Sequence, residues 1–83
     1  MDFYTVNLRR KYFMNNEWET SLEAYSLFVV ADSTEVAIAK ANQCIENHST
    51  ENMKFVLDGE IHKVFGLLQI ETLLGDGTTI VAV

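Results

Sequence analysis

The stretch Asp32–Ser49, DSTEVAIAKANQCIENHS, carries the clearest local signal in the sequence. Asp32 followed three residues later by Glu35 resembles a capping box, with Ser33 as the competing cap. Neither Gly nor Pro interrupts the helical pattern that follows. We therefore expect a helix from about Ser33 to Asn47.

One face of this expected helix gathers small and apolar side chains. Two alanines in the middle of that face allow the helix to lie close on a sheet, so the face serves packing first. At about 100° per residue, the face comprises Ala37, Ala41, Cys44, Ile45 and His48.

The residues before the helix predict two strands joined by a turn. From Phe3 to Met14 the chain is rich in β-branched and aromatic residues and alternates with the period of a strand. The stretch MNNEWE reads as the turn, because Asn15 and Asn16 tolerate left-handed backbone angles. A second strand over Ser21–Asp32 ends in a continuous apolar block, which is typical of burial on both faces. On the first strand, Tyr4, Val6 and Leu8 share one face, and Phe3, Thr5, Asn7, Arg9 and Lys11 share the other.

The chain after the helix returns to strand patterns. We expect strands at about Met53–Leu57, Glu60–Leu68 and Thr78–Val83. Asp58-Gly59 between apolar runs is a strong hairpin signal, which sets His62 opposite about Phe55.

Two segments near the end of the chain have less distinct patterns than the strands. Gly75–Gly77 suits a hairpin turn better than a phosphate-binding loop, because it is short and no helix is expected after it. Gln69–Leu74 fits either a strand continuation or a short helical turn.

Together these elements predict an α+β fold over residues 1–83, read as a single domain. It is an antiparallel sheet of four to five strands with one helix packed on one face, in the order β-β-α-β-β-β. One helix does not cover both faces of such a sheet, so we expect a second copy to cover the rest and form a two-fold homodimer. The large side chains expected on the exposed face are Phe3, Phe13, Trp18, Tyr25 and Phe65.

Charge and composition limit the classes of partner and the cellular location that we expect. The formal net charge of -6 argues against nonspecific nucleic-acid binding, which rests on many Lys and Arg contacts to phosphates. No apolar stretch is long enough to cross a bilayer and no signal-peptide pattern opens the chain, so we expect a cytoplasmic protein without membrane association. Cys44 is the one cysteine, which rules out an intramolecular disulfide and fits a reducing compartment.

The basic triplet Arg9-Arg10-Lys11 is the first candidate site. In a strand Arg9 and Lys11 leave one face and Arg10 the other, so the cluster is split. Ion pairs with the acidic remainder of the chain are the simplest reading. The alternative is a small-molecule binding protein or enzyme, in which Arg9, Lys11 or Tyr12 holds an anionic ligand in a pocket between sheet and helix or at a dimer interface.

The other reactive side chains do not indicate a catalytic or metal site. Cys44 and His48 lie one helical turn apart, but both are expected against the sheet, where a buried thiol is inert. The His, Cys, Asp and Glu spacings match no metal motif, and no cofactor is expected. Trp18, in a polar loop beside Glu17 and Glu19, fits an interface hot spot as well as a lid over the core.

Three stretches, FYTVNLRRKYF (3–13), ADSTEVAIAKANQ (31–43) and HKVFGLLQIETLLGDGTTI (62–80), resemble a small bacterial family called domain of unknown function 4288. Residues 64–67 stand for its F-x-G segment and Asp76-Gly77 for its later turn. The resemblance implies a compact α+β fold and supplies no catalytic residue. Small binding proteins of phages and mobile elements are a further analogy.

The leading hypothesis is a noncatalytic binding module. It is a homodimer that recognises a basic protein partner through its acidic surface and through exposed aromatic side chains near Trp18 and Tyr25.

Overall fold

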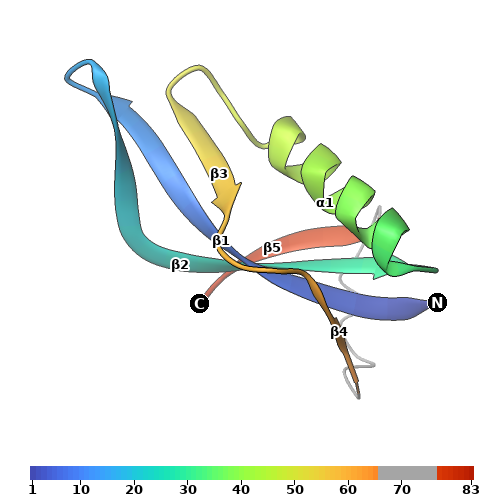
Figure 1. Cartoon of the computed structure of the whole chain (residues 1–83). Helices are drawn as coiled ribbons and strands as arrows, with labels where there is room; N and C mark the ends of the chain where they lie inside the picture. Colours follow the sequence, from blue (N-terminus) through green and yellow to red (C-terminus); the bar gives the residue numbers. More distant parts are fainter. Residues whose placement is uncertain (66–76) are drawn as a thin grey trace.

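The computed structural model describes residues 1–65 and 77–83. The fold is the expected α+β arrangement, an antiparallel five-stranded sheet with one helix on one face (Figure 1). Its elements are β1 (Asp2–Met14), β2 (Glu17–Ala31), α1 (Thr34–Asn47), β3 (Met53–Leu57), β4 (His62–Val64) and β5 (Thr78–Ala82).

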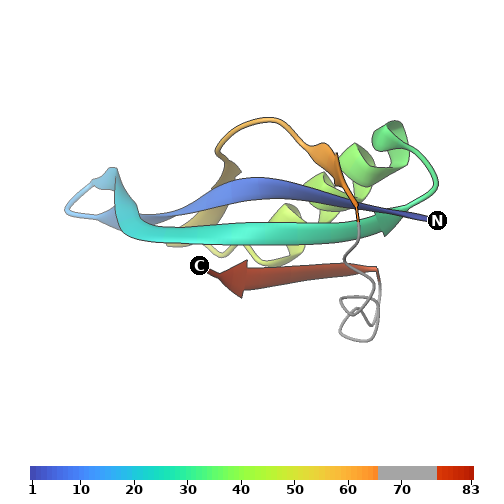
Figure 2. The same cartoon turned by 90° about the horizontal axis from the view of Figure 1, so that it is seen from below.

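β1 is the strand on which the sheet is assembled. β2 pairs with one edge of β1 along nearly its full length. The other edge is shared by β3, opposite Leu8–Tyr12, and by β4, opposite Phe3–Thr5. β5 adds to the outer edge of β2, which gives the order β3-β1-β2-β5 with β4 beside β1. The β1–β2 hairpin reaches well past the end of β5, so the molecule is elongated, 43 × 22 × 21 Å (Figure 2).

A tight turn joins the first two strands. Asn15 and Asn16 have positive φ angles of 54° and 64°, as expected, and Met14 pairs directly with Glu17. Two-residue turns of this kind match the twist of the flanking strands, so pairing resumes at once. The expected strand start at Ser21 is therefore wrong, because β2 already begins at Glu17.

The β1–β2 ladder contains one irregularity. Three residues of β2, Ser21 to Glu23, lie opposite the single residue Arg10 of β1. The insertion amounts to two residues, which is one full period of side-chain alternation, so the strand keeps the same face toward the helix on both sides of it. Leu22 at the bulge is 97% exposed, although it is a large apolar residue.

The core lies between the sheet and α1. Tyr4, Val6 and Leu8 are buried on the helix side, as their alternation predicts. The far end of β2 is buried on both faces, again as predicted. From the helix, Ala37, Ala41 and Cys44 are buried, and their small size lets α1 lie close on the strands.

The start of α1 settles the alternative between two caps. Ser33 has extended backbone angles, and its Oγ accepts a hydrogen bond from the backbone N–H of Val36 at 3.2 Å. Ser33 is therefore the N-cap, and Asp32 lies outside the helix.

The other end of α1 corrects the expected packing face. His48 is the C-cap, with φ of -98° and ψ of 4°, and its side chain is exposed, although Nδ1 lies 3.6 Å from Cys44 Sγ. The expectation that His48 packs against the sheet is wrong, because its ring folds back on the end of the helix, where Nδ1 lies 2.8 Å from the carbonyl oxygen of Cys44.

The expected hairpin at Asp58-Gly59 is also wrong. β3 and β4 do not pair with each other; both run antiparallel to β1 and follow one another along the same edge. Phe55 pairs with Arg10, and His62 pairs with Thr5. The backbone N–H of Asp58 donates to the carbonyl oxygen of Asn7 at 2.8 Å, which holds the connection to β1 and keeps the chain direction.

The end of the chain is described in part. β5 over Thr78–Ala82 agrees with the strand expected there. Of the strand expected over Glu60–Leu68, β4 forms only His62–Val64; Glu60, Ile61 and Phe65 are not in a strand, and residues 66–68 lie outside the described residues. The expected turn at Gly75–Gly77 and the alternatives for Gln69–Leu74 also lie outside them, Gly77 excepted.

Two leucines of β2 provide a matched test of the core. Leu27 is fully buried and Leu22 is 97% exposed. Leu27→Ala should lower the free energy of unfolding by about 2–5 kcal/mol, because it removes buried methyl groups and leaves a cavity. Leu22→Ala should change it by less than about 0.5 kcal/mol. Urea denaturation measures both, and equal effects would contradict this packing.

The capping assignment has its own test. Ser33→Ala should destabilise the protein by about 1 kcal/mol, because the N–H of Val36 loses its acceptor. Asp32→Ala should cost clearly less in the same denaturation experiment. The reverse order of the two effects would show that Asp32 caps the helix.

Candidate functional site

The basic residues of β1 separate onto the two faces of the sheet, as predicted. On the face away from α1, Arg9 Nε lies 3.1 Å from Asp58 Oδ2, and Arg9 Nη1 donates to the carbonyl oxygen of Leu22 at 3.3 Å. Arg9 thus links β1 to the end of β3 and to the β2 bulge. Lys11 lies on the same face and, within the described part of the chain, takes part in no ion pair.

Arg10 points to the helix side and lies among aromatic rings. Its Nη2 is 3.2 Å from Glu23 Oε2, and its guanidinium carbon lies 4.8 Å and 5.2 Å from the ring centres of Tyr12 and Tyr25. The Tyr25 hydroxyl donates to the same oxygen of Glu23. This Arg10 cluster closes the core where the helix no longer covers the sheet, so its first role is structural.

Tyr25 is buried, which corrects the expectation that it is an exposed aromatic. It shares the helix-facing side of β2 with Leu27, and its ring meets the edge of Phe55 at 5.2 Å. The period of two along the strand places it there. The hydrogen bond to Glu23, aided by burial, raises the pKa of the Tyr25 hydroxyl above its usual value.

An exposed aromatic patch lies near the tip of the β1–β2 hairpin. Phe13 and Trp18 pair directly across the strands with their ring centres 5.4 Å apart, and Lys54 Nζ lies 4.2 Å from the centre of the Trp18 ring. Phe13 and Trp18 remain 40% and 39% exposed. Trp18 therefore does not serve as a lid over the core, and this patch is available for contact.

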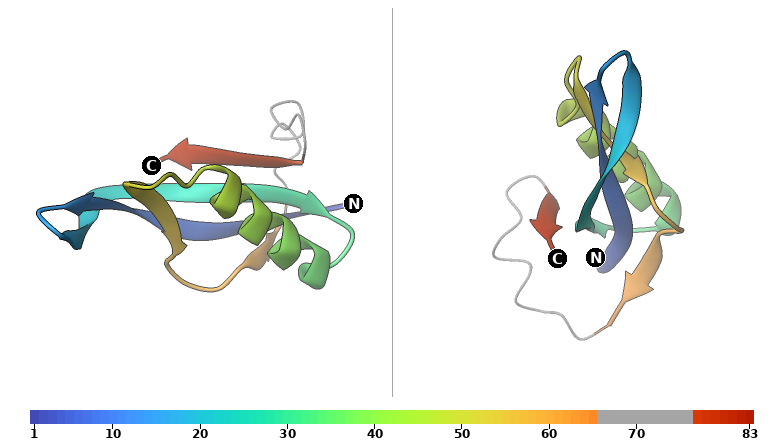
Figure 3. Two further views of the ribbon diagram at one scale, coloured as in Figure 1. Left: turned by 90° about the horizontal axis from the view of Figure 1, so that it is seen from above. Right: turned by 90° about the vertical axis from the view of Figure 1, so that its left-hand side faces the viewer.

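The patch belongs to a larger open face of the sheet. α1 lies on one side (Figure 3). On the other side Val30, at the far end of β2, is buried, and no described element packs on the rest of the face. Beside Phe13 and Trp18, this open face presents Val81, which is 43% exposed. Phe65, just after β4, is 80% exposed, whereas Phe3 is half-buried.

Most basic side chains are engaged within the protein, whereas most acidic side chains of the described residues are not in ion pairs. Five of the six basic side chains make contacts within the protein: Arg9, Arg10 and Lys63 pair with carboxylates, Lys54 lies over Trp18, and Lys40 donates to the carbonyl oxygen of Val30. Of the ten acidic side chains in residues 1–65 and 77–83, only three are in ion pairs. The seven without one are Glu17, Glu19, Asp32, Glu35, Glu46, Glu51 and Glu60.

Cys44 and His48 are close but are not arranged as nucleophile and base. His48 Nδ1 lies 2.8 Å from the carbonyl oxygen of Cys44 and 3.6 Å from its Sγ. The carbonyl is only an acceptor, so this nitrogen carries the proton and is not free to take one from the thiol. Cys44 is also buried, at 4% exposure. His62 is exposed and near a backbone carbonyl, and no metal-binding cluster of His, Cys, Asp or Glu occurs within residues 1–65 and 77–83.

Two cavities lined by described residues border the helix. A groove of about 370 Å³ lies between α1 and the β3–β4 connection, and a hollow of about 110 Å³ lies beside Cys44 and Lys40. None of Arg9, Lys11 and Tyr12 lines either of them. The structure thus brings Arg9, Lys11 and Trp18 to the open face, and Tyr12 and Tyr25 to the helix side.

Two of these side-chain contacts were not predicted from the sequence. Arg10 and Glu23 are brought together by the β2 bulge, which leaves no sequence signal. The partnership of Phe13 and Trp18 was within reach, because a two-residue turn at Asn15-Asn16 sets them opposite each other.

No protein-family model, curated protein or solved structure matches this chain. The resemblance to domain of unknown function 4288 stays a prediction. Within the described residues, α1 is too short and too polar to span a bilayer.

The contacts of the Arg10 cluster should affect the titration of the Tyr25 hydroxyl. Glu23→Gln should lower the pKa of Tyr25, because the neutral amide accepts a weaker hydrogen bond and no longer opposes a phenolate by its charge. NMR of ring-labelled tyrosine, with Tyr25→Phe to assign the signal, follows the titration toward high pH. Glu19→Gln, on the same strand, is the control and should leave the Tyr25 titration in place; an unchanged titration in Glu23→Gln would contradict the contact.

Proposed function

We propose that this protein is a noncatalytic binding module that acts as a two-fold homodimer and recognises a basic protein partner. The observation that carries the proposal is the open face of the sheet, where Phe13, Trp18 and Val81 are about 40% exposed and no described helix or second sheet packs on them.

The size of the surface supports self-association. The accessible area is 5610 Å² for 9.4 kDa, whereas a compact monomer of that mass exposes about 5000 Å². The radius of gyration of 13.2 Å likewise exceeds the roughly 12 Å expected for this length. A sheet packed by a second copy would bury apolar side chains that water now reaches, and a two-fold arrangement closes without leaving a further free face.

The charge pattern supports a basic partner. The seven carboxylates without an ion pair give the surface a net negative potential, and the basic side chains that would oppose it are mostly engaged within the protein. An anionic ligand finds less support, because Arg9 is already paired with Asp58 and Lys11 lines neither cavity. The proposed location is the cytoplasm, where Cys44 stays a free thiol.

The homodimer is tested by its mass in solution. Light scattering should give about twice 9.4 kDa for the unaltered chain. Val81→Lys should shift the mass toward that of the monomer, because it places a charge in the proposed interface.

Val36→Lys is the matched control for this experiment. Val36 is also 43% exposed, but it lies on α1, away from the open face. The control should remain dimeric. A 9.4 kDa particle at high concentration of the unaltered chain would overturn the homodimer.

A further inference from the structure

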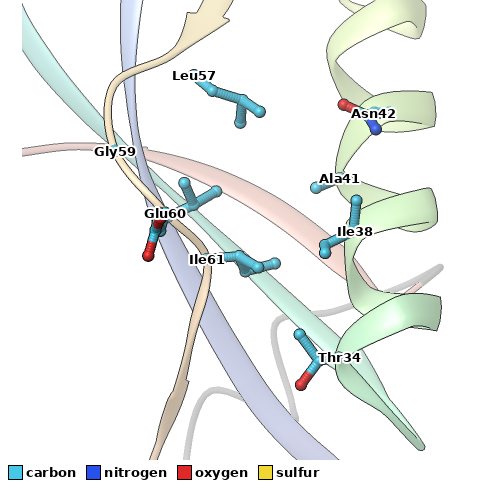
Figure 4. Close-up of a pocket in the computed structure, with 9 residues that line it drawn as sticks. Thr34, Ile38, Ala41, Asn42, Leu57, Gly59, Glu60 and Ile61 are labelled. Atoms are coloured by element: carbon cyan, nitrogen blue, oxygen red, sulfur yellow. The ribbon is translucent and has the colours of Figure 1, made fainter.

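The groove beside α1 arises where β1 has no regular strand partner. β3 ends opposite Leu8 and β4 begins opposite Thr5, so residues 58–61 pass opposite only Asn7 and Val6. The connection bulges away from the sheet there, and α1 lies across from it (Figure 4). The resulting groove holds about 370 Å³.

The groove has an apolar floor and partly exposed apolar rims. Val6 and Ala41 lie at its base and are buried. Ile38 on the helix and Leu57 at the end of β3 line opposite sides and are 42% and 48% exposed, and Ile61 extends the wall toward β4. Figure 4 shows Ile38, Leu57 and Ile61 projecting into the space between the two walls.

The charged residue that lines the groove is acidic, and two further acidic residues lie on the neighbouring surface of α1. Glu60 lies in the wall formed by the β3–β4 connection. On α1, Glu35 and Glu46 fall on the same stripe as the lining residue Asn42, seven residues before it and four after it. None of these carboxylates is in an ion pair, and no Lys or Arg lines the groove.

The shape favours a chain segment as the occupant. A pocket for a small molecule buries about 70–90% of its ligand, whereas the rims of this groove remain nearly half exposed. An apolar floor accepts aliphatic side chains, and the carboxylates of Glu60 and of the neighbouring surface of α1 favour Lys or Arg on either side of them.

We propose that this groove binds a segment of a partner protein in which aliphatic side chains are flanked by Lys or Arg. The proposal rests on the proposed function, because it assigns a surface to the basic partner. The groove lies on the helix side of the sheet, so binding there leaves the open face free for the second copy (Figure 4).

Synthetic peptides test the chemistry of the occupant. The probes are dye-labelled peptides of leucine and lysine, one with helical and one with alternating spacing, and binding is followed by fluorescence anisotropy. At least one of them should bind saturably and more weakly at high salt. Counterparts with glutamate in place of lysine, or serine in place of leucine, should bind at least about tenfold more weakly.

Matched variants locate the binding site. Glu35→Lys with Glu46→Lys should weaken binding of the leucine-lysine peptide by about tenfold or more. Glu17→Lys with Glu19→Lys makes the same change in net charge on the hairpin and should weaken it by less than about threefold. Ile38→Asn should also weaken binding, whereas Val36→Asn, equally exposed on the same helix, should not. Circular dichroism confirms that each variant is folded.

The outcomes separate this proposal from the homodimer. Failure of both leucine-lysine peptides to bind, or equal effects of the groove variants and their controls, would overturn the groove assignment even if the protein is dimeric. Binding of dodecylamine without binding of either peptide would make the groove a small-molecule site and would also overturn it. A monomer that binds the peptide at the groove would refute the homodimer and leave the groove assignment standing.

Discussion

The structure depends on the hydrogen-bonding requirement of β1. Its backbone N–H and C=O groups need partners on both edges, and neither β3 nor β4 is long enough to fill an edge of 13 residues. β2 satisfies one edge, and β3 and β4 divide the other. Where they leave a gap, the N–H of Asp58 still donates to the carbonyl oxygen of Asn7. The groove beside α1 is a direct consequence of this division.

Because side chains alternate along each strand, the two faces of the sheet differ in composition. The β2 bulge and the β3–β4 connection each add two residues relative to β1, so neither shifts apolar side chains to the wrong face. The helix side is thereby closed by Ala37, Ala41 and Cys44 over the strands. The opposite side keeps the aromatic patch of Phe13 and Trp18, which no described element covers.

The ion pairs within the protein affect both its stability and the net charge that it presents to a partner. Arg9 and Arg10 anchor the ends of neighbouring segments through Asp58 and Glu23, and this use removes them as sites for an anion. Exposed pairs of this kind contribute little to stability, up to about 1 kcal/mol each. Their larger effect is on the field around the molecule, since carboxylates without an ion pair, Glu60 in the groove among them, are left facing solvent. The proposed basic partner follows from this imbalance.

The sequence by itself determined the α+β class, the Asn15-Asn16 turn, the extent of α1 and the buried face of β1, because each follows from periods and backbone preferences within a few residues. The burial of Tyr25 also follows from the period along β2, although its aromatic character suggested an exposed site. Only the tertiary structure decided the pairing of β3 and β4 and the formation of the groove. Asp58-Gly59 carries a local hairpin signal, but the unfilled edge of β1 offered both short strands hydrogen-bond partners without a reversal of the chain. Such competition between distant backbone groups has no counterpart in a local pattern.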